Sequence, residues 1–296
     1  MLTRRFVGNL SNIATKGSIL ERYLNDPLKL VIIPINKHKL FVYCKHHDSL
    51  QNKKSRIQTT EKWVVNKFTS LWLKLVNSPK SYNQKIVKWV NQTIDRIPWP
   101  EASLLTIPGE SYILKRLLHD EGQDILQHSP SRHVTTKEYK NLKPKPRIQP
   151  INLYFPLTDS WKSDSILKEL RTFSEMGITN YKKRTMVYLS LIPFTLPIGL
   201  LPIVPNIPGF YLAYRSYCSY KAYIGAKHLK SLLDHGTGFN GDNKINLSEL
   251  PDFTNLINNE TYLTEKRVDA LVQLLDIKET RNILLKAVRQ ETNSHS

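Results

Sequence analysis

An uncharged apolar stretch constrains this chain more than any other feature. It runs from Thr185 to Tyr214, thirty consecutive residues without Asp, Glu, Lys, Arg or His. One helical crossing of a membrane needs about 20 predominantly apolar residues, so the stretch suffices for one crossing or for two shorter halves. Basic residues flank it on both sides, as is typical of segments beside phosphate headgroups. We therefore predict anionic-lipid contacts at Lys182, Lys183, Arg184, Arg215, Lys221 and Lys227. The alternative is a buried helix of a soluble domain.

Prolines interrupt the stretch. Because each proline lacks a backbone N–H and clashes with the preceding helical turn, one unbroken helix is not expected. The tightest cluster predicts a membrane kink at Pro202, Pro205 and Pro208. It would separate a first half near 186–200 from a second half near 208–228. With basic residues on both flanks, a hairpin that returns to the side it entered from fits better than one kinked crossing, which stays open.

Composition points to anionic partners and to mitochondria. The chain has 43 basic and 25 acidic residues and a formal charge of +18, which favours binding to lipid headgroups, RNA or an acidic protein. Residues 1–25 combine Arg4, Arg5 and Lys16 with apolar and hydroxyl residues and have no acid before Glu21. This pattern predicts a mitochondrial targeting segment.

No motif for catalysis or for a cofactor is present. The two cysteines, Cys44 and Cys218, lie far apart, without neighbours at metal-ligand spacing. Glycine patterns for phosphate or dinucleotide binding are missing, as are hydrolase and metalloprotease motifs. We expect no catalytic residues, no metal site, no cofactor and no enzymatic activity.

The N-terminal region, residues 26–120, is expected to hold a hairpin followed by helices. Two β-branched runs, Leu28–Ile35 and Leu40–Cys44, predict a small hairpin, in which Pro34 would make the first run an edge strand. Apolar residues at helical spacing predict an antiparallel helical pair near 60–76 and 86–97 and a further helix at 110–119.

The remaining chain is expected to comprise a linker, a membrane-associated region and a tail. Residues 121–160 are basic and contain several prolines, which is typical of a linker. Residues 161–235 contain the apolar stretch and a preceding helix that Gly177 would end. Residues 236–296 read as a polar tail with short helices. The predicted fold is a mainly α integral membrane protein with amphipathic helices, a small N-terminal β-hairpin and a proline-kinked hydrophobic helical hairpin.

Three segments resemble the mitochondrial K+/H+ exchange-related protein family. They are LVIIPINKHKLFVYC at 30–44, IDRIPW at 94–99 and LPIVPNIPGFYLAYRSYCSYKAYIGAKHL at 201–229, and the resemblance spans about residues 28–233. It implies a transmembrane protein of the mitochondrial inner membrane that contributes to potassium/proton antiport and to matrix potassium and volume homeostasis. The family has no established catalytic residues, so none is carried over.

The leading hypothesis is a component or regulator of this ion transport. Because the apolar stretch has no ionisable side chain, the chain by itself shows no proton relay. The expected partners are inner-membrane lipids such as cardiolipin and other subunits of an ion-exchange complex; DNA is excluded and RNA disfavoured. A membrane-tethered adaptor that binds mitochondrial RNA or ribosomes, or that organises inner-membrane complexes, is the alternative.

Overall fold

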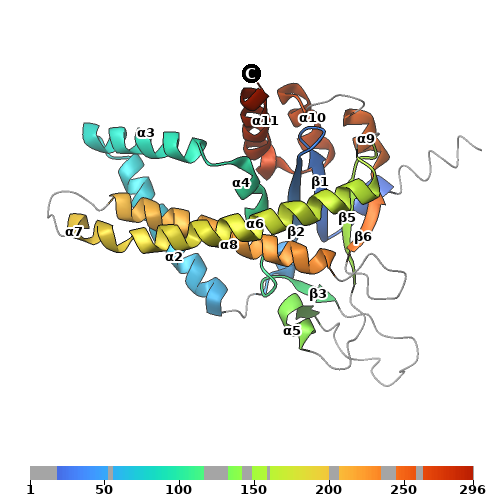
Figure 1. Ribbon diagram of the computed structural model, residues 1–296, viewed down its shortest axis with the longest axis horizontal. Helices are drawn as coiled ribbons and strands as arrows, with labels where there is room; N and C mark the ends of the chain where they lie inside the picture. The colour runs from blue at the N-terminus through green and yellow to red at the C-terminus, as the bar shows by residue number, and fades with distance from the viewer. Residues whose placement is uncertain are drawn as a thin grey trace, which may run out of the picture.

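A four-stranded mixed sheet lies at the centre of the chain, which is otherwise mainly helical (Figure 1). The computed structural model describes residues 19–52, 56–116, 133–141, 149–158, 161–199, 207–234, 245–257 and 263–295. The strands, in their order across the sheet, are β2 (Leu40–His46), β1 (Leu28–Pro34), β5 (Ile151–Phe155) and β6 (Ile245–Glu249). β2 pairs antiparallel with β1, whereas the β1–β5 and β5–β6 pairs are parallel.

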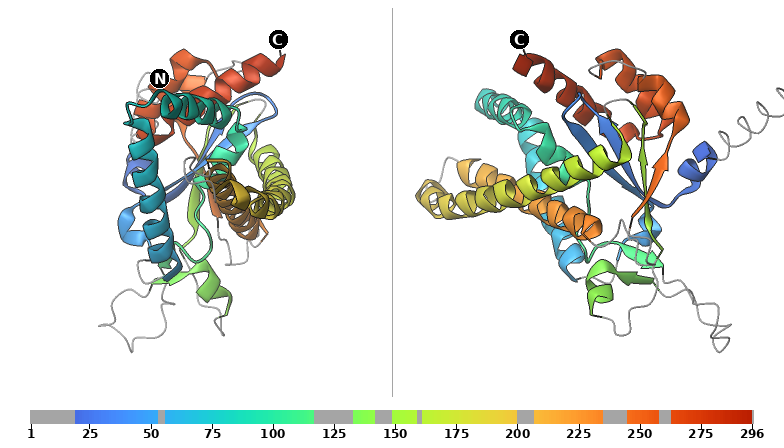
Figure 2. Two further views of the ribbon diagram at one scale, coloured as in Figure 1. Left: turned by 90° about the vertical axis from the view of Figure 1, so that its left-hand side faces the viewer. Right: turned by 45° about the vertical axis from the view of Figure 1, so that its right-hand side comes forward.

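Strand β1 is buried on both faces, which explains its almost continuous apolar sequence. Successive side chains of a strand point to opposite faces. Leu30 and Ile32 accordingly belong to one core cluster, whereas Val31 and Ile33 belong to the other. The sheet therefore separates two hydrophobic layers, each covered by helices (Figure 2).

The first layer is built by a long helical hairpin of α6 (Ser163–Leu191) and α8 (Ile207–Leu233). The two helices lie side by side in every view (Figures 1 and 2). The short helix α4 (Trp99–Leu105) packs across α8. Gly177 was expected to end α6, but the helix continues through it. A side chain at Gly177 would contact Leu104 and Ala226, so this glycine permits close packing rather than a helix end.

The second layer comes from the C-terminal residues. The helices are α9 (Pro251–Ile257), α10 (Glu265–Leu274) and α11 (Arg281–His295). Glu291 on α11 accepts hydrogen bonds from the Trp99 indole at 2.9 Å and from the Asn36 amide at 3.0 Å. Residues 236–296, predicted to be a polar tail, thus supply the strand β6 and much of one core cluster.

Two further helices form an arm beside the hairpin. Both predicted helices are confirmed, but they meet only near their turn and then diverge, so the expected antiparallel pairing is wrong (Figure 2). They are α2 (Arg56–Val76) and α3 (Ser81–Asp95), called the α2–α3 arm below. The other elements are a helical segment at 19–25, η1 (Asp48–Leu50), β3 (Leu114–Arg116), β4 (His133–Thr135), α5 (Thr136–Lys140), η2 (Pro193–Thr195), α7 (Leu196–Gly199) and η3 (Lys278–Thr280).

Two details of the predicted secondary structure are wrong. The N-terminal hairpin is present, but β1 is an inner strand and not an edge. The parallel pairing with β5 ends at Val31, so the missing N–H of Pro34 falls beyond it. The helix expected at 110–119 is replaced in its described part by β3, because Leu114–Arg116 pairs with β4 instead. The inner strand β5, inside the predicted linker, was not foreseen.

The predicted transmembrane character finds no support in the structure. Among the residues described, no helix combines the length and the apolar character that a bilayer span requires. The fold is thus mainly helical, as expected, with a mixed sheet that goes beyond the predicted hairpin.

Candidate functional site

The end of the α6–α8 hairpin projects beyond the sheet and exposes large apolar side chains (Figure 1). Phe194 in η2 is 78% exposed, and Leu196, where α7 begins, is 60% exposed. The exposed apolar residues of this end, called the hairpin tip below, are Met186, Val187, Leu189, Leu191, Phe194, Leu196, Phe210 and Tyr214. Contiguous exposed apolar side chains of this kind mark interaction sites on proteins.

The six predicted lipid-contact residues fall into two groups. Lys182, Lys183 and Lys227 are exposed. The other three enter ion pairs. Arg184 and Arg215 reach Glu101, and Lys221 reaches Glu61. Of the predicted kink residues, Pro208 is the second residue of α8, whereas Pro202 and Pro205 lie outside the described residues.

A buried ion pair fixes the base of the hairpin tip. Glu101 on α4 is fully buried and accepts two hydrogen bonds from the Arg215 guanidinium, at 2.7 and 2.9 Å. Burial lowers the pKa of Arg215, but hydrogen bonding and charge attraction from Glu101 outweigh it and raise that pKa above its usual value. Arg184 on α6 approaches the same carboxylate at 3.6 Å. One acid therefore joins α4, α6 and α8 where the tip leaves the core.

The α2–α3 arm touches the start of α8 through aromatic side chains. Phe68 packs edge-on against Phe210, with ring centroids 5.9 Å apart, and Trp89 packs against Tyr211 at the same separation. The arm also exposes large apolar residues, namely Trp63, Val65, Leu73, Val76, Tyr82 and Trp89. The turn that joins α2 to α3 and the hairpin tip lie on the same side of the molecule (Figures 1 and 2).

A polar cluster around Glu61 connects the arm to the body. Its carboxylate accepts hydrogen bonds from the Tyr217 hydroxyl at 2.5 Å, the Tyr112 hydroxyl at 2.7 Å and the Lys221 ammonium at 2.8 Å. Desolvation alone would raise the pKa of Glu61, but these donors together lower it. Glu61 therefore stays ionised and ties α2 to α8.

His228 on α8 is buried and contacts Pro108, which follows α4, and Thr136, the first residue of α5. Its Nδ1 lies 2.6 Å from the Pro108 carbonyl oxygen, which can only accept, so Nδ1 carries the proton. Its Nε2 lies 3.2 Å from the Thr136 hydroxyl and can accept from it. Burial, with a smaller contribution from the positive charge of Lys115, lowers the pKa of His228 to about 4.

The low pKa of His228 predicts a loss of stability in mild acid. In the folded chain the ring binds a proton only near pH 4, whereas in the unfolded chain it does so near its ordinary pKa of about 6.5. The contribution of neutral His228 to the free energy of unfolding is complete above pH 6.5. It falls by about 3 kcal/mol as the pH decreases towards 4. Urea unfolding at several pH values checks this. The stability difference between the wild type and a His228→Gln variant should shrink over that interval; a constant difference would contradict the assignment.

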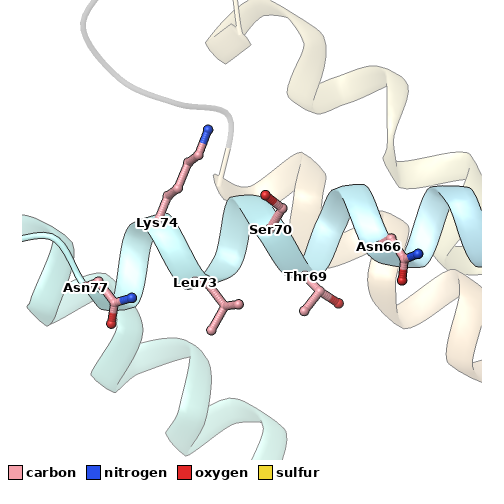
Figure 3. Close-up of a pocket in the computed structure, with 6 residues that line it drawn as sticks. All are labelled: Asn66, Thr69, Ser70, Leu73, Lys74 and Asn77. Atoms are coloured by element: carbon pink, nitrogen blue, oxygen red, sulfur yellow. The ribbon is translucent and has the colours of Figure 1, made fainter.

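A hollow beside α2 does not form a chemical site. Five of its six lining residues lie on this one helix and the sixth, Asn77, follows directly after it; they are Asn66, Thr69, Ser70, Leu73, Lys74 and Asn77 (Figure 3). None of them is acidic, and no group of three or more His, Cys, Asp or Glu side chains suited to a metal occurs in the described part of the chain.

The acids that organise the site were not identified from the sequence. Glu101 and Glu61 lie on different helices from Arg215 and Lys221, more than a hundred residues away along the chain. Local spacing carries no information about such pairs. Their signal is weak: Glu101 is an acid between the apolar residues of a short helix, and Glu61 is the one acid in a basic helix.

The chain matches a known family along most of its length. Residues 29–233 match the model of the mitochondrial K+/H+ exchange-related family. An uncharacterised protein of Saccharomyces cerevisiae is 38% identical over 294 residues, covering 93% of this chain and 88% of that protein. An uncharacterised protein of Schizosaccharomyces pombe is 24% identical over 208 residues, covering 70% and 75%. No solved structure matches. The chain therefore belongs to the mitochondrial K+/H+ exchange-related family.

Proposed function

We propose that this protein is a component or regulator of potassium/proton exchange at the mitochondrial inner membrane. The family match over residues 29–233 is the observation that carries this proposal. The hairpin tip supports an interaction at the membrane, because it exposes eight large apolar side chains beside exposed lysines. In this role the protein helps to set matrix potassium content and volume.

We assign the chain an accessory role and not that of the ion carrier. Proton-coupled transporters place ionisable side chains along the path of the ion. Residues 185–214 contain no Asp, Glu, Lys, Arg or His, and Glu101, at the base of the tip, is buried and held by Arg215. The charges at the base of the tip therefore stabilise the fold, and the ion path would belong to a partner subunit.

Swelling of isolated mitochondria in potassium acetate tests this proposal. Swelling there requires exchange of matrix protons for potassium, so mitochondria without the protein should swell several-fold more slowly. Addition of nigericin, an ionophore that itself exchanges potassium for protons, should restore the rate. Normal swelling without the protein would contradict the proposal.

The rate of protein synthesis in the same mitochondria distinguishes the adaptor hypothesis from the proposed role in exchange. An adaptor for RNA or ribosomes would lower mitochondrial protein synthesis first, and nigericin would not restore it. An accessory exchange subunit should leave the initial rate of labelled amino-acid incorporation unchanged while swelling is slow.

A further inference from the structure

We infer that the hairpin tip inserts into one leaflet of an anionic bilayer and does not cross it. The surface is the set of eight apolar side chains defined above, and its occupant is lipid. The inference rests on the proposed function in one respect: the proposed function says which membrane the tip enters. Insertion itself is independent of it, because binding to vesicles can be measured without any exchange activity.

The depth of the tip matches one leaflet. Lys182 and Lys183 are exposed on α6, and Phe194 follows eleven residues after Lys183. At 1.5 Å per helical residue this corresponds to roughly 16 Å. Half of the hydrocarbon core of a bilayer is about 15 Å. With the two lysines among the headgroups, Phe194 would lie near the bilayer centre.

The charge pattern along the hairpin fits this orientation. Arg184 and Arg215 both reach Glu101, so these parts of α6 and α8 lie beside each other at the base of the tip. Tyr214, which precedes Arg215, is 43% exposed there. Tyrosines and lysines are typical of the headgroup region, and the sequence between the two arginines is free of charge.

The arm adds a basic surface on the same side. Between residues 56 and 95 the sequence has seven basic residues and two acids, and one of these acids, Glu61, is paired with Lys221. The exposed Trp63, Tyr82 and Trp89 accompany those lysines. Such a surface suits anionic headgroups. The same positive charge disfavours a dimer formed through two hairpin tips, because the exposed lysines of both copies would then approach one another.

Flotation of the full chain with lipid vesicles tests the inference. The chain should float with vesicles of phosphatidylcholine and cardiolipin. A Phe194→Asp/Leu196→Asp variant should lose partitioning at least on the order of 100-fold, because both acids would lie in hydrocarbon. Met176→Asp is the matched control. Met176 is 51% exposed on α6 but precedes Lys182 by six residues, on the side away from the tip, so this variant should float like the wild type.

A fluorescent label measures the depth. Cys44 and Cys218 are buried, so a Phe194→Cys variant can be labelled selectively with an environment-sensitive dye. Quenching should be strongest with nitroxide lipids labelled near the bilayer centre, and dithionite sealed inside the vesicles should leave the dye intact. Reduction by internal dithionite would indicate a crossing and overturn the inference.

Other results would assign the surface to a protein. If the wild type fails to float, and sedimentation shows a dimer that the double variant abolishes, the occupant is a second copy and the inference fails. It fails equally if the double variant floats like the wild type. Slow swelling in mitochondria without the protein, together with no vesicle binding, would overturn the inference and leave the proposed function standing.

Discussion

A Gly225→Ala variant is expected to lose about 3 kcal/mol or more of its free energy of unfolding, although alanine is the better helix former. A β-carbon at position 225 would overlap the Leu104 carbonyl oxygen and lie 2.9 Å from the Ile107 carbonyl oxygen. Both oxygens belong to backbone that a rotamer change cannot move. Helix propensity alone would predict a gain of up to about 1 kcal/mol, so the sign of the change identifies the cause.

Gly177→Ala provides the graded control. A β-carbon there would lie 2.8 Å from a terminal methyl of Leu104 and 3.0 Å from the Ala226 β-carbon. Since the Leu104 side chain can shift, the loss should be smaller than at Gly225. Urea unfolding monitored by circular dichroism gives both values. Equal effects at the two glycines, or a more stable Gly225→Ala variant, would show that α4 and α8 do not approach as described.

Replacement of Glu101 by glutamine should cost about 3 to 5 kcal/mol, because it leaves the Arg215 guanidinium buried without its counter-charge. Arg215 is only 3% exposed, so water cannot replace the lost partner. Thermal unfolding should shift downward by roughly 10 °C for a domain of this size. A similar loss is expected for Arg215→Leu, which leaves the Glu101 carboxylate buried and facing only the more distant Arg184.

Two variants give this measurement its controls. Arg184→Gln removes a charge that is 3.6 Å from Glu101 and 42% exposed, so the expected cost is below about 1 kcal/mol. A Glu101→Leu/Arg215→Met double variant removes both charges together and should recover much of the lost stability. If Glu101→Gln and Arg184→Gln lowered stability equally, Glu101 would not be the buried centre of this cluster.

The local features of the fold could be predicted from the sequence. The β1–β2 hairpin, the helices α2 and α3 and a helical hairpin around the prolines follow from apolar spacing, turn residues and the exclusion of proline from helix interiors. The family resemblance over residues 28–233 is confirmed by the match over 29–233. Each of these rests on neighbouring residues or on a continuous motif.

Long-range pairing could not be predicted. β5 and β6 are five-residue strands whose partners lie about a hundred residues away, and short apolar runs do not specify such partners. Gly177 looks like a helix end until the residues that approach it, Leu104 and Ala226, are known. For the same reason the sequence alone predicts that the whole helical hairpin is embedded in a membrane. Its inner half, with Ala222, Ala226 and Leu229, covers the sheet, whereas most of the large apolar side chains that it exposes lie at its outer end.

Potassium-acetate swelling of mitochondria that carry only a variant protein tests the central claim most directly. The claim is that exchange depends on this protein through its hairpin tip. Mitochondria with Met176→Asp should swell at the wild-type rate, whereas those with Phe194→Asp/Leu196→Asp, at equal protein level, should swell as slowly as mitochondria without the protein. Wild-type swelling with the double variant would contradict the account.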